Sequence, residues 1–578
     1  MASVQTLLLG RHADAVRAAL DQLRTTRYLQ RMWDTDASLW SSDATTQAAI
    51  RQRLGWLTSP RLMAQQTASL RSFAKEIRDA GFTRALLLGM GGSGLFSEVC
   101  RKTFGVSTNH LDLAVLDTTD PTAIRDAQNR GPLKQLIAIV SSKSGGTSEV
   151  SALSKHFYES FKAGGSPGAH CVAITDQGTP LEAQAAALQF RRAFVHGPST
   201  GADVGGRFSA LTYFGLVPAA LMGIDIDTLL ARAIEMLERC GPTQPLEENP
   251  AAQLGAVLGC LARQGREKMT LLCPPALESF GTWVEQLIAE STGKAGKGIA
   301  PFYGEPLDGL GVPMDDRVFV ELQLASSIDA GIDRHVRALS DAGHPVVRIH
   351  WQDRYDLGGD VIRWFLASTI ASHLMEINPF DEPNVQESKD RTKALLAEYA
   401  KGGRWPNETP LLANGELAFF GAAQAVTPNS ATQCLANWTQ QGRSGDYVAI
   451  LSFLPRTARL DEAVHALRRQ VARLRRCATT VGFGPRYLHS TGQLYKGGPD
   501  AALFLELTAE ESDDVPVPGE PFTFGVLKQA QALGDFQAMQ QRGRRILRVH
   551  LRGDLDRSMQ QLLSAVEEST KHQIPNSK

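Results

Sequence analysis

The sequence lacks the features of a membrane-spanning or disulfide-bonded protein. No stretch of about 18 apolar residues is free of charge, so no membrane-spanning helix is expected. Near the start, Arg11 and the residues after it cut the run Leu7–Leu9 far short of a secretory core. The seven cysteines are scattered, with no CxxC pair and no Cys/His cluster of metal-binding spacing. We therefore expect reduced thiols and a cytoplasmic location.

An excess of charge of one sign is also absent. Lys and Arg number 60, Asp and Glu number 61, and the formal net charge is −1. Without a broad basic surface, neither nucleic acid nor an anionic membrane is expected as a main partner. A locally positive pocket for one small anion stays compatible with this balance.

The chain is too long for one compact core. At roughly 100–200 residues per domain, its 578 residues predict about three domains. The changes in pattern along the chain place the expected boundaries as follows: an N-terminal helical layer over 1–80, a first α/β domain over 81–225, a second α/β domain over 226–400, and a C-terminal α+β module over 401–578.

Short apolar strands alternate with helical stretches in the two central parts. The first set is predicted at Arg84–Leu88, Leu111–Leu116, Gln135–Val140 and Cys171–Thr175, and the second at Lys268–Cys273, Val318–Leu324 and Val346–Trp351. Such alternation predicts right-handed βαβ units and parallel sheets. We therefore expect two three-layer αβα domains in tandem.

The last part of the chain reads differently. Between Tyr447 and Leu551 the predicted order of elements is βαββαβ, followed by a closing helix over Asp554–Glu568. That order is typical of a ferredoxin-like α+β module.

Two strand-to-helix turns have the composition of a phosphate site. Gly89–Gly94 is rich in glycine, and Ser142–Thr147 adds hydroxyls and a lysine. Such turns bring backbone N–H groups and hydroxyls close to an anion at the carboxyl end of a sheet. Many strand-to-helix turns use glycine only for geometry, so the structural interpretation of Gly91-Gly92-Ser93 stays open. Neither turn fits the Walker spacing, and the dinucleotide fingerprint fits poorly.

These turns belong to a set of motifs that resembles the phosphoglucose isomerase family, especially the isomerase half of fused transaldolase–isomerase proteins. The matching segments, in the family's order over roughly residues 30–400, are Gly89–Ser93, Ser142–Thr147 with Glu149, Gly205–Ser209, Gln286 with Glu290–Lys294, and Asn378–Asp381 leading to Val385 and Lys389. The resemblance implies two sugar-isomerase (SIS) domains and interconversion of glucose 6-phosphate and fructose 6-phosphate. It also implies no metal or organic cofactor, a small sugar phosphate as partner, and a homodimer.

The resemblance also implies roles for individual residues. Glu290 would be the base that moves the proton between C2 and C1, with Gln286 one turn earlier on the same helix face. Arg207 would stabilise the enediolate, and Lys389 would help to open the ring or stabilise charge. The implied substrate-binding residues are Gly92, Ser93, Ser142, Lys143, Ser144, Thr147 and Gln286. The alternatives are an exposed helical glutamate, a structural ion pair at Arg207 and a solvated lysine.

The sequence departs from the family pattern at three places. Glu382 stands where the family usually has Gln, and Asn384-Val385-Gln386 replaces Gly-Val-Glu. A carboxylate at 382 would repel the sugar phosphate or the enediolate unless it were paired. The family's ring-opening histidine has no counterpart, because the matching stretch is Asp316–Phe319.

We expect His489 to replace that histidine, because it lies in a polar loop and histidine transfers protons near neutral pH. The alternative, a loop that merely packs on its own module, stays open. His344 and His335 are weaker rivals, since one immediately precedes a strand and the other lies within a helix.

Two other functions remain open. A non-catalytic sugar-phosphate sensor would use the same phosphate loop, and an isomerase could accept mannose 6-phosphate as well. A transaldolase partner domain is not expected, because the roughly 80 residues before the first sheet are too few for a barrel of about 250.

Overall fold

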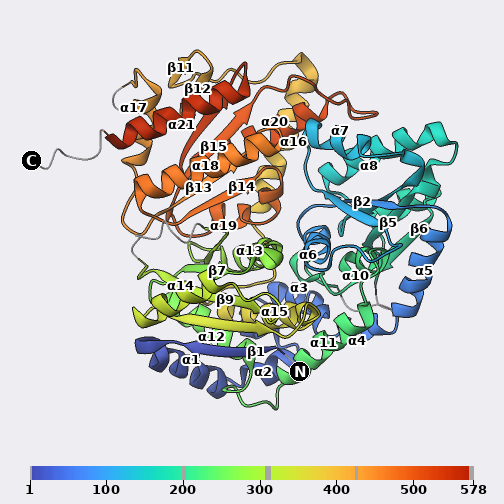
Figure 1. Cartoon of the computed structure of the whole chain (residues 1–578), viewed down its shortest axis with the longest axis vertical. Coiled ribbons are helices and arrows are strands. Elements are labelled where there is room, and N and C mark those ends of the chain that lie inside the picture. Colours follow the sequence, from blue (N-terminus) through green and yellow to red (C-terminus); the bar gives the residue numbers. More distant parts are fainter. Residues whose placement is uncertain (1–2, 198–202, 306–313, 423–426, 572–578) are drawn as a thin grey trace, which may run out of the picture. The chain divides into compact units, whose positions relative to one another are not determined.

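The computed structural model (Figure 1) describes residues 3–197, 203–305, 314–422 and 427–571. Its contacts divide the chain into two compact units. In the described chain, the first unit comprises 3–117, 127–304 and 314–382. The second comprises 118–126, Glu305 and 383–571. No helix among these residues is long and apolar enough to cross a membrane.

The first sheet of the first unit is parallel throughout, as the sequence predicts. Its spatial order is β3-β2-β4-β5-β6. The bounds are β2 (Arg84–Leu88), β3 (Asp112–Leu116), β4 (Leu136–Ser141), β5 (Cys171–Asp176) and β6 (Arg192–His196). Every residue of the central strand β4 is buried, as expected for a parallel strand covered by helices on both faces. The helices that follow these strands in the first unit are α6 (Leu95–Phe104), α8 (Ser148–Phe161), α9 (Pro180–Ala187) and α10 (Tyr213–Leu221). Most of α7 (Pro121–Asn129), which follows β3, belongs to the second unit.

The second sheet lies in the same unit and has the order β1-β10-β9-β7-β8. Its strands are β1 (Val4–Leu8), β7 (Lys268–Leu272), β8 (Ala300–Tyr303), β9 (Arg317–Leu324) and β10 (Val346–Trp351). Four strands run parallel, and β1 pairs antiparallel with β10. The two parallel cores confirm the tandem α/β architecture. The N-terminal layer, which was expected to be helical, also contributes the edge strand β1.

Helices fill the rest of the first unit. The N-terminal ones are α1 (Ala13–Thr25), α2 (Tyr28–Trp33), α3 (Ala44–Gln52), α4 (Ser59–Ala64) and α5 (Thr67–Asp79). Those that accompany the second sheet are α11 (Ile226–Arg239), α12 (Pro250–Arg263), α13 (Glu278–Thr292), α14 (Ala330–Asp341) and α15 (Asp356–Leu374). Helix α15 packs against α11, α12 and α13, and α13 also packs against α6 of the first sheet. One hydrophobic core therefore runs through both sheets of this unit.

The second unit corrects the expectation of a ferredoxin-like module. Its sheet has the order β11-β12-β16-β15-β13-β14, in which β13, β14, β15 and β16 pair parallel. A ferredoxin-like βαββαβ sheet would instead be antiparallel. The strands are β11 (Leu412–Asn414), β12 (Leu417–Gly421), β13 (Tyr447–Ser452), β14 (Thr479–Phe483), β15 (Ala502–Ala509) and β16 (Arg545–Leu551).

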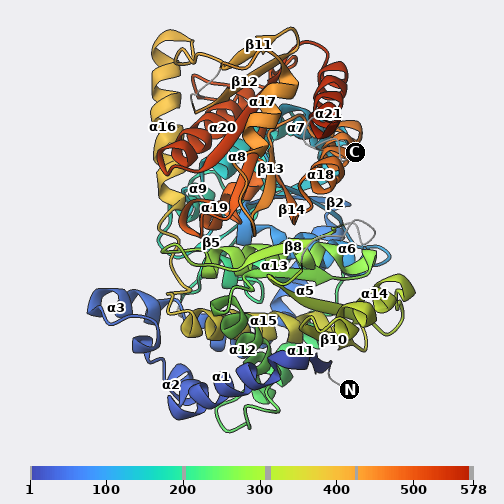
Figure 2. The same cartoon turned by 90° about the vertical axis from the view of Figure 1, so that its left-hand side faces the viewer.

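The ferredoxin-like expectation fails at one connection of this sheet, the one between β14 and β15. The segment from β14 to β15 is not a simple hairpin loop, because it holds a 3-10 turn over Arg486–His489 and helix α19 (Gly492–Gly497). It carries the chain to the far side of β13, so β15 runs parallel to β13. Figure 2 shows α19 of this segment close to β13 and β14. The other helices of the unit are α16 (Val385–Gly402), α17 (Ala431–Thr439), α18 (Ala458–Arg475), α20 (Phe524–Gln541) and α21 (Leu555–Lys571).

Candidate functional site

The candidate site is built around Arg207, in the turn Gly206–Phe208 of the first unit. This arginine is 3% exposed, and all five of its N–H donors have acceptors. Nε donates to Ser291 Oγ (3.2 Å), and Nη1 donates to the carboxylates of Glu290 (3.1 Å) and Glu382 (3.2 Å). Nη2 donates to the carbonyl oxygens of Pro379 (2.7 Å) and Asp381 (2.9 Å). The guanidinium thus connects three segments that are far apart in sequence.

Glu290 lies in the last turn of α13, a helix that is mostly buried. Every residue from Trp283 to Thr292 is buried, so polar side chains in this stretch need specific partners. Glu290 is 7% exposed, and Gln286, one turn earlier, is 3% exposed. The predicted base therefore lies within hydrogen-bond distance of the predicted arginine. Glu290 is therefore not the exposed helical glutamate of the alternative interpretation.

Glu382 carries the second carboxylate on Arg207, and it also contacts Arg53. Arg53 Nη1 lies 3.3 and 3.2 Å from the two Glu382 carboxylate oxygens and donates to Phe380 O at 2.5 Å. Burial raises the pKa of Glu382, but Arg207 and Arg53 outweigh it, so the net shift is downward. The carboxylate that departs from the family pattern is therefore paired and ionised. Arg53 carries no signal in the sequence, because its partner lies 329 positions further on.

Lys294 fastens the loop that carries Glu382. Its Nζ donates to Asp381 Oδ1 (2.8 Å) and to Asn378 O (2.5 Å). Burial and the nearby Arg207 lower the pKa of Lys294 to about 7. Lys294 and Arg207 therefore both donate hydrogen bonds to the segment Asn378–Glu382. These bonds join the segment to the two motifs that carry Lys294 and Arg207.

The first glycine turn packs backbone to backbone against the Arg207 turn. A Cβ built on Gly92 would lie 1.9 Å from Gly206 O, a distance that only glycine avoids. Ser209 Oγ donates to both Gly206 O (2.7 Å) and Gly92 O (3.2 Å). Ser141 Oγ donates to Ser93 O at 2.8 Å, which links this turn to the end of β4. Gly92 thus allows the close approach of the two turns.

The serine-rich turn follows β4, the neighbour of β2 in the sheet. Ser142 Oγ lies 3.1 Å from Thr147 Oγ1, and Ser144 Oγ accepts from Gly146 N at 3.3 Å. Lys143 Nζ pairs with Asp176 (2.6 Å) and Asp203 (2.5 Å). Burial opposes the charge on Lys143, but the two aspartates outweigh it and raise its pKa. The hydroxyls therefore gather at the carboxyl edge of the sheet, as predicted, while the lysine is neutralised by carboxylates.

The remaining predicted residues belong to the second unit. Lys389 is exposed on α16, and His489 is half-buried at the end of the turn Arg486–His489. Their assigned roles stay predictions. In the first unit, the stretch that lacks the expected histidine begins β9, where Arg317 is fully buried and donates to Thr270 Oγ1 at 3.0 Å.

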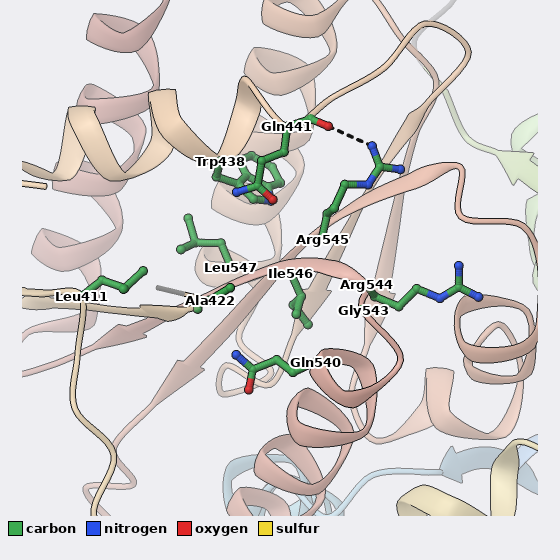
Figure 3. Close-up of a pocket in the computed structure, with 11 residues that line it drawn as sticks. Leu411, Ala422, Trp438, Gln441, Gln540, Gly543, Arg544, Arg545, Ile546 and Leu547 are labelled. Carbon is green, nitrogen blue, oxygen red and sulfur yellow. Dashed lines mark hydrogen bonds between the residues drawn. The ribbon is translucent and has the colours of Figure 1, made fainter. Parts of the chain in front are cut away.

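The second unit contains a cavity of about 180 Å³ beside the start of β16 (Figure 3). Arg545 lines it and donates to Gln441 O (3.0 Å) and to Asp446 Oδ2 (2.5 Å). Arg544 extends away from the cavity and donates to the carbonyl oxygens of Lys496 and Gly498. Both guanidinium groups are engaged by the protein, which argues against this cavity as an anion site.

The chain is similar in sequence to several glucose-6-phosphate isomerases. It is 29% identical over 405 residues to the enzyme of a Synechococcus strain, covering 59% of this chain and 74% of that one. A probable glucose-6-phosphate isomerase of Haloarcula marismortui is 26% identical over 66% of this chain and 92% of its own. The enzyme of Citrifermentans bemidjiense is 33% identical, but the match spans 41% of this chain and 48% of that one. No protein-family model matches.

Solved structures share the fold. A hypothetical protein from Thermus thermophilus superposes with a TM-score of 0.57 at 23% identity, covering 68% of this chain and 100% of its own. A glucose-6-phosphate isomerase from Chlamydia trachomatis superposes with a TM-score of 0.52 at 19% identity, covering 64% of this chain and 78% of its own. In sequence, the chain is similar to glucose-6-phosphate isomerases, and it shares its fold with these two solved structures.

Proposed function

We propose that the protein interconverts glucose 6-phosphate and fructose 6-phosphate, with Glu290 as the base. The observation that carries this proposal is the buried contact between Glu290 and Arg207, 3.1 Å apart. The turn that carries Arg207 contacts the first glycine turn, which is hydrogen-bonded to the end of β4 before the serine-rich turn. A sensor would need the anion site, but it would not need a buried carboxylate held on an arginine.

The chemistry follows from the positions of these groups. The phosphate would lie against the hydroxyls of Ser142, Ser144 and Thr147 at the carboxyl edge of the first sheet. The Glu290 carboxylate would take the proton from C2 and return it to C1, because one base on one face of the sugar serves both carbons. Arg207 holds this carboxylate in place and supplies fixed positive charge beside the enediolate. No step of this proton transfer calls for a metal or an organic cofactor.

A coupled assay of fructose 6-phosphate to glucose 6-phosphate, with EDTA present, tests the proposal. We expect Glu290→Gln to lower kcat by about 10²- to 10⁴-fold, the range for loss of a general base. Glu285→Gln is the matched control, since Glu285 lies on the same helix and is also 7% exposed. It should keep most of the activity. Absence of turnover in the wild type, with fructose 6-phosphate still bound, would favour the sensor.

Substrate range and assembly are part of the same proposal. Contacts to the C2 hydroxyl decide whether mannose 6-phosphate is accepted as well, and a product assay with that sugar decides between one substrate and two. We also propose a homodimer, which light scattering would detect as twice the mass of the chain. The cytoplasmic location expected from the sequence belongs to this proposal too.

A further inference from the structure

Glu382 bridges two arginines at the candidate site. Its Oε2 atom lies 3.2 Å from Arg207 Nη1 and 3.2 Å from Arg53 Nη1. Its other oxygen lies 3.3 Å from the same nitrogen of Arg53. One carboxylate therefore has two alternative cationic partners, one buried and one half-exposed: the side chains of Arg207 and Arg53 are 2% and 34% exposed.

Arg207 has no spare N–H group in this arrangement, because its five donors serve five protein acceptors. Negative charge that develops on a bound sugar beside Glu290 can reach the guanidinium only by displacing one acceptor. Two of the five are backbone carbonyls, and two are side chains of the buried helix α13. The fifth is the side chain of Glu382.

Glu382 is the acceptor that can leave at the lowest free-energy cost. Its side chain is 37% exposed, against 9% for Glu290, so it has room to move and water to solvate it. It also keeps a partner when it leaves, because Arg53 already contacts both of its oxygens. Repulsion between its charge and a new anion would drive it in the same direction.

We propose that Glu382 is an exchangeable ligand of Arg207, which moves fully onto Arg53 when negative charge develops on the substrate beside Glu290. This inference rests on the proposed isomerase function and adds a positioning role for Arg53. Lys294 and Arg207 fix the loop Asn378–Glu382, so the exchange involves the Glu382 side chain alone. It accounts for a carboxylate at a position where the related family usually has an uncharged Gln.

The inference predicts an unusual relation between two substitutions. Arg53→Met removes the second partner, so Glu382 stays on Arg207 and competes with the anionic intermediate. We expect kcat to fall by about tenfold, equivalent to about 1.4 kcal/mol. Adding Glu382→Gln removes the competing charge, so the double variant should return to within about threefold of Glu382→Gln alone. Residues with a merely structural role would instead give losses that add.

Binding measurements separate this inference from the proposed function. The probes are a five-carbon aldonic acid 5-phosphate, whose carboxylate mimics the enediolate, and the uncharged alditol 5-phosphate, both followed by calorimetry. We expect Arg53→Met to weaken the aldonate by about tenfold relative to the alditol, and Glu382→Gln to strengthen it. Arg53→Lys keeps the charge and should behave like the wild type.

Each possible result either supports or overturns the proposed exchange of Glu382. Rescue by Glu382→Gln, together with a changed preference for the aldonate, supports the exchange. Additive losses, or an aldonate-to-alditol ratio that is the same in all variants, overturns it. If Arg53→Met does not fold, Arg53→Gln, which also removes the charge but keeps a polar side chain, takes its place in the same comparison. A wild type without turnover, but with a ratio that responds as expected, would refute the isomerase and leave the exchange standing.

Discussion

At the scale of single residues, the site depends on how closely two turns approach each other. Gly92 and Gly206 belong to separate motifs, 114 positions apart, and their backbones are in contact. The turn at Gly206 carries Arg207, so the contact also sets where the guanidinium can lie relative to α13. Glycine is required on one side of this contact only, because the space around a Cβ differs between the two residues.

This difference predicts the effect of adding one methyl group to each turn. Gly92→Ala places a Cβ 1.9 Å from Gly206 O, and backbone cannot yield as a flexible side chain would. We expect the unfolding free energy to fall by about 1–3 kcal/mol, the usual cost of overpacking. Gly206→Ala is the matched control, because a Cβ there meets nothing within 4 Å. Urea denaturation measures both, and equal losses would contradict the contact.

The sequence predicts part of this site and misses another part for a physical reason. Arg207 and Glu290 could be assigned to one site in advance, because the motif resemblance names both residues and proton-transfer chemistry needs both, but their direct contact is a finding of the structure. Arg53 could not, since an arginine on a polar helix end is ordinarily solvated and no local pattern indicates a partner 329 residues away. The sequence did offer one signal. A carboxylate at position 382 needs a cationic partner beside an anionic substrate, although the sequence does not say which residue supplies it.

At the scale of secondary-structure elements, the second unit shows that periodicity predicts elements better than their pairing. The strands β13, β14, β15 and β16 and the helices α18 and α20 occur in the predicted order βαββαβ. The parallel order was missed because the segment between β14 and β15 reads as a polar loop, although it folds into a 3-10 turn and helix α19. A crossover and a hairpin differ only in that connection.

The strands of this sheet also differ between their two faces. Leu503, Leu505 and Leu507 of β15 join an apolar core with α18 and α21, whereas Thr508 on the other face pairs with His550 of β16. The Thr508 hydroxyl lies 2.9 Å from His550 Nδ1. Burial, together with nearby arginines, lowers the pKa of His550 to about 4. The histidine is therefore neutral in the folded sheet at neutral pH.

This pKa predicts a loss of stability in acid. Between pH 6.5 and about 4 the unfolded chain binds a proton at residue 550 while the folded chain does not, so stability falls as the pH is lowered. The slope from this one group is at most about 1.4 kcal/mol per pH unit. His550→Gln removes the group, so the difference between wild type and variant should change across this window. Urea denaturation at several pH values measures it, and a constant difference would contradict the assignment.

At the scale of the whole molecule, the second unit is assembled from separate parts of the chain. Residues 118–126 leave the first sheet after β3 and belong to the second unit. Asp120, 1% exposed, accepts from Lys528 Nζ at 2.7 Å and from Arg456 N at 3.2 Å. Thr119 Oγ1 donates to Gln531 at 2.8 Å. A buried ion pair thus joins segments 408 residues apart in sequence.

Removing the cation of this pair should cost more stability than removing an exposed one. Lys528→Met leaves Asp120 buried without its cation, and we expect the unfolding free energy to fall by about 3–5 kcal/mol. Arg469→Met is the matched control in the same unit, because Arg469 pairs with Glu462 at the same 2.7 Å while both side chains are exposed. That pair is expected to contribute less than about 1 kcal/mol.

Thermal unfolding followed by circular dichroism compares the two variants. The double variant Asp120→Asn/Lys528→Met should recover part of the loss, since the charge on Asp120 is then gone and only Glu511, the other carboxylate paired with Lys528, stays without its cation. Similar losses for Lys528→Met and Arg469→Met would mean that residues 118–126 are not held in the second unit by this pair.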